Sequence, residues 1–319
     1  MEKESKIYVT GHTGLVGSAI VRRLKDDGFT NLLWISHKDC DLRIPNQVSE
    51  LFKQERPEYV FLVAAKVGGI YANITYPAEF IYDNLEIQTN VIHSAWKAKV
   101  KKLIFLSSSC IYPKLSPQPM LEEYLLTGLM EPTNEMFGIA KIAGVKMCQA
   151  YKRQYNCRCI SAIASNLYGL NDNYNLKNSH VLAALIRKFH EAKINKLEKV
   201  TLWGDGSPRR EFLYVDDLVD ALLFLMDNYN EEEPINIGYG IDINIKELAQ
   251  IVKSEVGYLG EIYWDVNKPK GTTRKLLDVT KLNNLGWKYN ISLKDGIHAT
   301  YKYFVEYDYP DILKKELNG

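Results

Sequence analysis

The sequence Lys6-Ile7-Tyr8-Val9-Thr10-Gly11-His12-Thr13-Gly14-Leu15-Val16-Gly17 has the form of a short strand, a glycine-rich turn and the start of a helix. The apolar residues Ile20, Val21 and Leu24 that follow share one helical face. Glycines at this spacing let the backbone turn sharply, admit a pyrophosphate and let the helix pack on the strand, while the helix N-terminus supplies N–H donors. A glycine triplet between a strand and a helix therefore predicts a dinucleotide-binding site.

Apolar strands and amphipathic helices alternate after this turn. The predicted strands cover residues 6–10, 32–35, 59–65, 103–106, 159–164 and 235–238, and the predicted helices cover 84–97 and about 140–155. Strands that alternate with helices at this spacing predict an α/β fold with a parallel, doubly wound sheet of the Rossmann type.

The pattern changes beyond residue 169. Segment 165–169 is predicted to be a loop at the carboxyl edge of the sheet, and 270–275 a basic loop. Between them we expect a polar loop at 171–175, a helix from Ser179 to about Ala192, a strand at 200–203, a turn at 204–212 and a helix from about 214. We predict a Rossmann domain of residues 1–169, rejoined by about 213–240, and a smaller mixed α/β substrate lobe of 170–212 and 241–319.

Composition excludes several classes of function. The 319 residues carry 40 basic and 39 acidic side chains, so a net charge of +1 gives no overall field to attract nucleic acid or a membrane surface. No apolar run approaches the ~18 residues of a membrane span, and the amino terminus lacks the apolar core of a signal peptide. The five cysteines are scattered, and Cys157-Arg158-Cys159 has no second ligand pair. We expect no metal site and a reducing cytoplasm.

The end of the second strand indicates the cofactor. An NAD enzyme usually carries Asp or Glu there for the adenine ribose. Here the chain continues Ser36-His37-Lys38, and because a basic residue suits a 2′-phosphate, NADP(H) is favoured; alternatively, Lys38 points into solvent. We expect cofactor contacts from Gly11, His12, Thr13, Gly14, Leu15, Val16, Gly17, His37, Lys38, Asp41, Leu42, Ala64, Ala65, Lys141, Asn166, Leu167 and His180.

Two further segments carry reactive side chains. The strand at 103–106 ends in Ser107-Ser108-Ser109-Cys110, and helical spacing places Phe137 and Lys141 on one face, one turn apart. This layout resembles that of short-chain dehydrogenases/reductases, which use Ser/Thr, Tyr-x-x-x-Lys and a nicotinamide cofactor. In this chain Phe137 occupies the tyrosine position.

In such a reductase the tyrosine donates a proton to the carbonyl oxygen, and the lysine lowers the pKa of the tyrosine and holds the nicotinamide ribose. Ser108 and Lys141 fit the serine and lysine roles, with Ser109 a competitor for Ser108. Phe137 has no hydroxyl to donate. A Tyr→Phe substitution is the change made on purpose to trap a substrate complex, because it removes the hydroxyl and hardly disturbs packing. We therefore hypothesise that this chain is an inactivated form of an enzyme with tyrosine at position 137. A native Phe is the alternative, and the codon in the source gene distinguishes the two.

Several longer segments resemble the GDP-L-fucose synthase family of extended short-chain dehydrogenases/reductases, which are GDP-4-keto-6-deoxy-D-mannose 3,5-epimerase/4-reductases. The resemblance runs from about residue 6 to past residue 290. It rests on Ala64-Ala65-Lys66-Val67-Gly68-Gly69-Ile70, Ser108-Ser109-Cys110-Ile111-Tyr112-Pro113-Lys114, Glu131-Pro132-Thr133-Asn134-Glu135, Asn166-Leu167-Tyr168-Gly169, Asn178-Ser179-His180-Val181, Arg210-Glu211-Phe212 and Arg274-Lys275-Leu276-Leu277-Asp278-Val279.

The resemblance implies that Cys110 and His180 exchange protons at C3 and C5 of the sugar, which the 4-keto group acidifies. Hydride from NADPH then reduces C4, with residue 137 as the proton donor. Considered alone, Cys110 is an ordinary buried thiol and His180 a residue satisfied locally at a helix start. Thr13 and His37 stand where the family often has arginines, and Lys188 where an arginine is common. Substrate contacts fall on Ser109, Asn166, Lys188, Trp203 and Arg210.

Three alternatives stay open at this point. Arg210 alternatively forms a structural ion pair with Asp216 or Asp217. The substrate is alternatively a GDP-6-deoxy-4-keto-heptose that is reduced at C4 for a bacterial surface polysaccharide. In a third interpretation, the chain binds NADP without catalysis. A homodimer is expected, because the helices at 84–97 and 140–155 offer apolar faces to a second subunit, although packing within one subunit explains those faces equally well.

Overall fold

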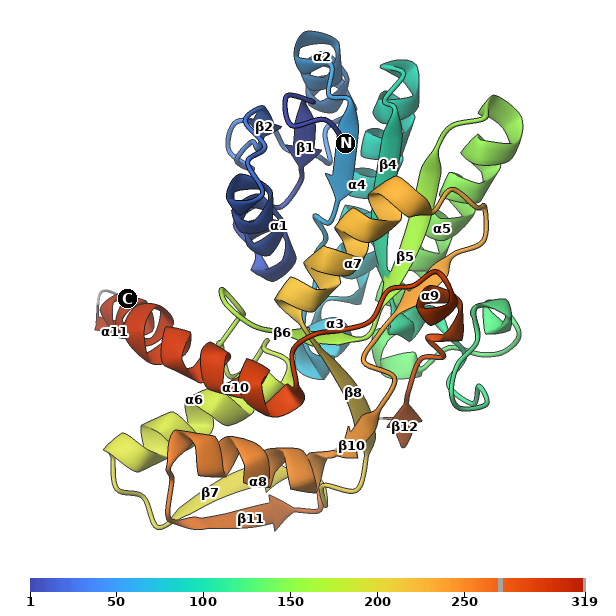
Figure 1. Cartoon of the computed structure of the whole chain (residues 1–319). Coiled ribbons are helices and arrows are strands. Elements are labelled where there is room, and N and C mark those ends of the chain that lie inside the picture. Colours follow the sequence, from blue (N-terminus) through green and yellow to red (C-terminus); the bar gives the residue numbers. More distant parts are fainter. Residues whose placement is uncertain (269–271, 318–319) are drawn as a thin grey trace.

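The computed structural model describes residues 1–268 and 272–317, and its central layer is a six-stranded parallel sheet (Figure 1). The strand order is β2-β1-β3-β4-β5-β9, and every neighbouring pair is parallel. The strands are β1 Ile7–Val9, β2 Leu32–Leu33, β3 Tyr59–Leu62, β4 Lys102–Ser108, β5 Cys159–Ala164 and β9 Ile235–Ile237. The predicted Rossmann-type sheet is confirmed, and β9 returns to it as expected.

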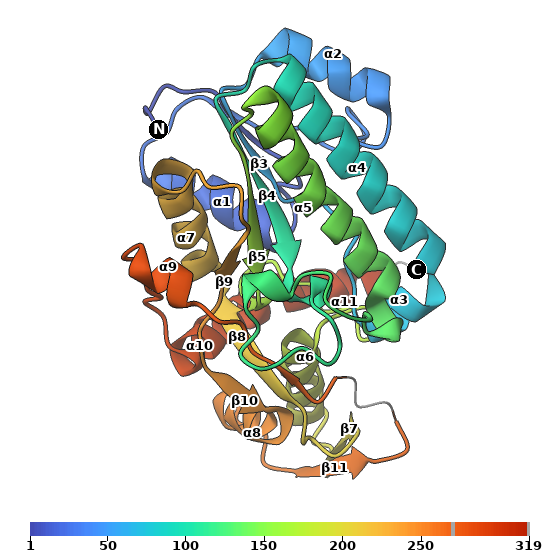
Figure 2. The same ribbon diagram turned by 90° about the vertical axis from the view of Figure 1, so that its right-hand side faces the viewer.

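Helices cover both faces of the sheet, because neighbouring residues of a strand point to opposite sides. Ile7 and Val9 pack into the apolar core shared with α1 Leu15–Asp26 and α7 Val215–Asn228. Tyr8 packs into a second core, formed with α2 Pro45–Glu55, α4 Pro77–Lys97 and α5 Glu135–Tyr155. Figure 2 shows α4 and α5 side by side on one face and α1 and α7 on the other. This double covering explains why the strands are almost wholly apolar.

A second lobe, made of the elements from β6 to β8, from β10 to β12 and from α10 to α11, lies beyond the carboxyl edge of the sheet (Figure 1). Its core joins α6, α8 and α10 through residues such as Phe189, Leu248 and Ile297. Its strands are β6 Asn166–Tyr168, β7 Lys199–Trp203, β8 Arg209–Tyr214, β10 Asp242–Asn244, β11 Glu261–Asp265 and β12 Arg274–Lys275. Its helices are α6 Val181–Ile194, α8 Ile245–Val256, α10 Leu293–Tyr303, the π-helix η4 Phe304–Asp308 and α11 Tyr309–Leu317. The short helix α9 Thr280–Asn284 instead packs against the central sheet, and its Leu282 lies in the core shared with α1 and α7.

Short helical segments surround the carboxyl edge of the sheet. They are α3 Ile70–Thr75 and the 3-10 helices η1 Ser109–Ile111, η2 Glu122–Tyr124 and η3 Pro132–Asn134. The residue boundaries predicted between the Rossmann domain and the substrate lobe stay a prediction. In the described part of the chain, no helix is long and apolar enough to cross a membrane.

Three predicted loops and turns were wrong. The segment 165–169 contains β6, the turn at 204–212 contains the start of β8, and Arg274 and Lys275 of the basic loop form β12; Lys270 and Gly271 lie outside the described residues. β6 and β12 pair with β8, which is distant in the sequence, so no local periodicity announces them. The helix predicted from residue 84 begins at Pro77, since proline suits a first helical turn.

Candidate active site

The glycine turn follows β1 at the point where the strand order reverses: β2 lies on one side of β1 and β3 on the other. Ligands bind at such a point in open α/β sheets. Gly11 has φ of +66°, and a Cβ there would meet Ala64 Cα at 3.0 Å. A Cβ on Gly17 would lie 2.1 Å from Gly11 O, so only glycine allows α1 to approach the turn. Gly14 caps α1 without a side-chain hydrogen bond, which leaves the first N–H groups of the helix for an anion.

Two glycine substitutions are expected to separate folding from cofactor binding. Gly17→Ala is expected to lower the free energy of unfolding by about 1–3 kcal/mol, because its methyl group clashes with backbone. At Gly14 a Cβ meets one neighbour, Gly11 O, at 3.6 Å, so Gly14→Ala is expected to cost about 1 kcal/mol at most and to weaken dinucleotide binding. Urea unfolding and a dinucleotide titration measure the two effects. Equal losses of stability in both variants would contradict this assignment.

The end of β2 carries aromatic and basic side chains. Trp34 is 38% exposed, the His12 ring lies 6.4 Å from it between centroids, and Lys25 Nζ lies 4.7 Å from its ring. The carboxylate of Asp41 is bound by the Arg43 guanidinium, which holds the pKa of Asp41 at about 2. The described groups here that are left for a ligand are therefore mainly basic.

Arg43 escaped the sequence analysis. Its guanidinium bonds both Asp41 and Asp83 of α4, and so fixes the loop after β2 to that helix. His37 Nδ1 lies 3.6 Å from Asp41 Oδ1, and Lys38 is exposed. The spacing Asp41-x-Arg43 is the sequence signal for the ion pair within the loop, but nothing in the local sequence indicates the second partner, Asp83.

The other predicted cofactor residues lie in or after the strands β3 and β6, in the loop after β2, and in the turn before α1 and its first residues. Ala64 and Ala65 follow β3, and the Ala64 N–H donates to Thr10 Oγ1 at 2.9 Å. The carbonyl of Leu42 accepts from Asn90 Nδ2 at 3.0 Å. Asn166 and Leu167 lie in β6, and Asn166 Nδ2 donates to the carbonyl of Glu211 at 2.8 Å. Thr13, Leu15 and Val16 belong to the turn and the first residues of α1.

Ser108 and Cys110 meet at the carboxyl end of β4. The Cys110 thiol donates to Ser108 Oγ at 3.3 Å, and Cys110 is buried as the middle residue of the following 3-10 helix η1. Ser109, the competitor, is buried with 6% exposure, whereas Ser108 is only half-buried. Ser108 is therefore the better placed hydroxyl for a ligand.

Phe137 and Lys141 lie one turn apart on α5, and Lys141 Nζ lies 5.9 Å from the centre of the Phe137 ring. Lys141 Nζ donates to the carbonyl of Leu106 in β4 at 2.9 Å. Burial lowers the pKa of Lys141 to about 8, partly offset by the nearby Cys110. The structure thus brings together Ser108, Cys110, Phe137 and Lys141.

His180 directly precedes α6 and belongs to a loop that packs against the chain after β3. The Gly69 N–H donates to the carbonyl of Asn178 at 2.9 Å, and a Cβ on Gly69 would meet Ser179 O at 2.7 Å. His180 is exposed at the surface, and partial desolvation by the neighbouring protein lowers the pKa of its imidazole. Among the described residues no hydrogen bond joins His180 to Cys110; groups that act on different carbons of one sugar do not need to touch.

Arg210 does not pair with Asp216 or Asp217, so that alternative was wrong. Asp216 pairs with Arg22, and the Asp217 carboxylate accepts from the N–H groups of residues 290 and 291. Arg210 Nη1 donates to the carbonyl of Arg209, and burial lowers the pKa of Arg210 to about 10, which leaves it charged at pH 7.

Lys188 of α6 and Trp203 of β7 both lie in the second lobe. Lys188 Nζ donates to the carbonyl of Thr201 at 3.3 Å, and burial lowers its pKa. Trp203 ends β7 with 53% of its surface exposed. Both are thus available to a ligand, but no described contact joins them to Ser108 or Cys110.

Lys275 is a residue that the sequence analysis missed as a site candidate. β12 pairs with β8 so that Lys275 is opposite Arg210, which places the two side chains on one face of the strands. Burial lowers the pKa of Lys275, while Cys110 and Glu131 act to raise it. Glu131 is itself paired with Lys114 Nζ at 3.1 Å and accepts from Thr272 Oγ1 at 3.2 Å. A predicted strand at 274–275 would have indicated that Lys275 faces the site. That strand forms only by pairing with the distant β8, so the local sequence does not predict it.

The sequence matches the model of the NAD dependent epimerase/dehydratase family over residues 7–238. A putative GDP-L-fucose synthase 2 of Arabidopsis thaliana is 59% identical over 306 residues, which cover 96% of this chain and 93% of that protein.

Two solved structures from Campylobacter jejuni have the same fold. A GDP-6-OMe-4-keto-L-xylo-heptose reductase gives a TM-score of 0.92 at 39% identity, covering 96% of this chain and 99% of that chain. A GDP-mannoheptose C4 reductase with NADP bound gives 0.89 at 41% identity, covering the same shares. Similarity of sequence and of structure therefore extends over almost the whole chain.

Proposed function

The chain belongs to the NAD dependent epimerase/dehydratase family, and from this premise we propose that it is an NADP(H)-dependent epimerase/reductase of a GDP-4-keto-6-deoxy sugar, of the GDP-L-fucose synthase type. The observation that carries the proposal is the 3.3 Å contact of Cys110 with Ser108, beside the buried ammonium of Lys141. It unites a thiol that can exchange protons at carbon with the serine and lysine of a carbonyl reductase.

The glycine turn fits a dinucleotide, because the N-terminus of α1 has no side-chain cap and a Cβ at Gly14 would meet Gly11 O only at an ordinary 3.6 Å. Bound there, the cofactor supplies the hydride that C4 receives. His12, His37 and Lys38 would face the 2′-phosphate, and Lys141 the nicotinamide ribose. We assign the remaining contacts to Ala64 and Ala65, which follow β3, and to Asn166 and Leu167 of β6, which follows β5; the carboxyl ends of these parallel strands share one edge of the sheet.

In the reduction, Ser108 Oγ donates a hydrogen bond to the C4 carbonyl oxygen and fixes its position. That oxygen must also gain a proton when C4 receives hydride, and Phe137 has none to give. The Lys141 ammonium, held by the carbonyl of Leu106, would acidify a phenol at position 137 but here faces an apolar ring. We therefore propose that this chain is an impaired form of a tyrosine enzyme.

Epimerisation needs an acid and a base rather than a phenol. The 4-keto group acidifies the C3 and C5 protons, so a base removes a proton from one face of the sugar and an acid returns one to the other. We assign these roles to Cys110 and His180. The lowered pKa of His180 keeps its imidazole neutral at pH 7 and able to accept a proton.

The second lobe is proposed to hold the GDP moiety. Arg210 and Lys188 supply cations for the diphosphate, and Trp203 offers an exposed ring to the sugar or the base. Lys275, opposite Arg210, adds a further cation on the same face. Ser109 and Asn166 are assigned to the sugar.

A second candidate substrate is a GDP-6-deoxy-4-keto-heptose, and the 39% identity to the heptose reductase over almost the whole chain supports it. The 59% identity to the putative fucose synthase favours the hexose. Turnover of both substrates by the Phe137→Tyr protein tests the proposal directly. Reduction of the hexose supports the fucose synthase type, and reduction of the heptose alone the alternative. Tight NADPH binding without any turnover would leave a non-catalytic NADP-binding protein.

Lys38→Glu is expected to weaken NADPH binding by about tenfold to a hundredfold, because a charge-assisted contact to the 2′-phosphate becomes a repulsion. NADH binding should hardly change. Lys53→Glu, on the exposed side of α2, makes the same change of net charge away from the cofactor and serves as the control. Fluorescence titration measures both dissociation constants. A similar loss for NADPH and NADH would contradict a 2′-phosphate contact.

We further propose a homodimer that pairs α4 and α5 with their copies. These helices share one outer face of the molecule (Figure 2), where Tyr82 is 61% and Ile139 38% exposed. Light scattering that gives the mass of a single chain would contradict the dimer. We also propose a cytoplasmic location, because an odd number of scattered cysteines suits a reducing compartment.

A further inference from the structure

Three of the five cysteines meet where α5 passes into β5, and the proposed chemistry uses none of them. The Sγ atoms of Cys157 and Cys159 lie 3.0 Å apart. Cys148 of α5 also interacts with the Cys159 thiol. Cys40 and Cys110, by contrast, are buried elsewhere in the fold. Their rates of oxidation can therefore be compared with that of Cys157 in the same protein.

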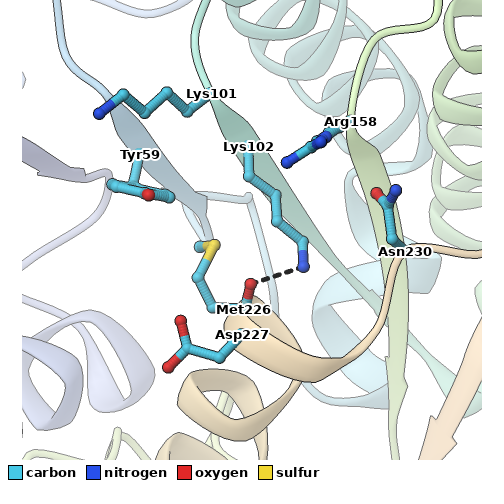
Figure 3. A pocket seen from close by; sticks show the side chains of 7 residues that line it. All are labelled: Tyr59, Lys101, Lys102, Arg158, Met226, Asp227 and Asn230. Atoms are coloured by element: carbon cyan, nitrogen blue, oxygen red, sulfur yellow. Dashed lines mark hydrogen bonds between the residues drawn. The ribbon is translucent and has the colours of Figure 1, made fainter. Parts of the chain in front are cut away.

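The backbone between Cys157 and Cys159 is a tight turn. The Cys159 N–H donates to the carbonyl of Cys157 at 2.8 Å, which closes a γ-turn with Arg158 at its centre. Arg158 lines a cavity of about 480 Å³ together with Lys102 and Asn230 (Figure 3). Because β5 begins at Cys159, the turn lies at the amino edge of the sheet, opposite the edge that carries Ser108 and Cys110.

The two thiols differ in a way that suits an attacking and a resolving cysteine. Cys157 is half-buried, and the hydrogen bond from Cys159 lowers the pKa of its thiol. Cys159 is 2% exposed, and its contacts with Cys148 and Cys157, together with burial, raise its pKa. Cys157 is therefore the thiol that loses its proton more readily, with Cys159 beside it at 3.0 Å, an arrangement found at reversibly oxidised cysteines.

We propose that Cys157 and Cys159 form a reversible disulfide when the protein meets a peroxide. The Cys157 thiolate attacks hydrogen peroxide: an S–O bond forms, the O–O bond breaks and hydroxide leaves. Cys159 then attacks the Cys157 sulfur, so that an S–S bond forms, the S–O bond breaks and water leaves. Two thiols and one peroxide thus give one disulfide and two waters. A thiol such as glutathione reduces it again, since a disulfide across so short a turn is labile.

Peroxide titration of the whole protein, followed by alkylation and peptide mass spectrometry, tests this proposal. We expect the peptide with Cys157 and Cys159 to lose two hydrogens, about tenfold or more faster than Cys40 or Cys110 is oxidised, because the rate follows the thiolate fraction. Dithiothreitol should restore it. In Cys159→Ser, dimedone should trap a sulfenic acid on Cys157, and Cys148→Ser should behave as the parent.

A disulfide between Cys148 and Cys159 would overturn the assignment of the pair. Oxidation of Cys110 ahead of Cys157 would overturn the proposal as a whole. A disulfide between Cys148 and Cys159 would leave the proposed reductase chemistry untouched, because these thiols lie at the sheet edge opposite Ser108 and Cys110.

Discussion

Phe137→Tyr is expected to raise the kcat for NADPH-dependent reduction of GDP-4-keto-6-deoxy-mannose by about 10²–10⁴, the usual contribution of a general acid. The substitution adds a hydroxyl to a ring that already lies 5.9 Å from Lys141 Nζ, on the same face of α5. The site otherwise keeps Ser108 and Lys141 in place. Loss of NADPH absorbance on addition of the substrate measures the rate.

Three comparisons separate this effect from a change in packing. Phe137→Leu should not restore activity, and Lys141→Met should remove most of the gain in the Phe137→Tyr protein while changing little in the parent. The ammonium form of Lys141 exists below its pKa of about 8, so the gain should fall as the pH rises through that value. Equal rates in the parent and in Phe137→Tyr would show that residue 137 is not the proton donor.

The central sheet and the residues at its carboxyl edge were predicted well, because short stretches of sequence carry the signals for them. The turn at Gly11, Gly14 and Gly17 allows no side chain at Gly17, and this steric fact is visible as a spacing. The pairing of Phe137 with Lys141 follows from helical periodicity alone. The contact of Cys110 with Ser108 follows from the end of one strand. Each of these features depends on residues close together in the chain.

Features that depend on distant pairing were missed. β12 exists because Arg274 pairs with Arg209 of β8, and only that register brings Lys275 to the face of Arg210. The position of Arg43 became clear only when α4 brought Asp83 beside it. The alternative of an ion pair between Arg210 and Asp216 or Asp217 was wrong for the same reason, since Arg22 of α1 pairs with Asp216 and distant backbone N–H groups bond Asp217. Short strands and ion pairs of this kind carry no periodic signal.

The parent chain, with Phe137, is expected to exchange the C3 and C5 hydrogens of GDP-4-keto-6-deoxy-mannose with solvent without reducing C4. Carbon acidity comes from the 4-keto group, and the proposed acid and base, Cys110 and His180, are both present. The phenol is needed only when the C4 oxygen gains a proton. Incorporation of deuterium from D2O, followed by NMR of the sugar, measures the exchange, and a sample without protein gives the background rate.

Cys110→Ser and His180→Gln are each expected to lower the exchange rate by about 10²–10⁴, whereas Cys40→Ser, which alters a buried thiol outside the site, should not. The lowered pKa of His180 means that the base stays neutral at pH 7, so on acidification the exchange should decline at a lower pH than a histidine with an ordinary pKa would give. Exchange that vanishes in the parent but appears in Phe137→Tyr would show that the phenol takes part in both steps. If neither protein exchanges and Phe137→Tyr still reduces C4, Cys110 and His180 are not an epimerase pair, and a C4 reductase that acts on an already epimerised or heptose substrate becomes the better assignment.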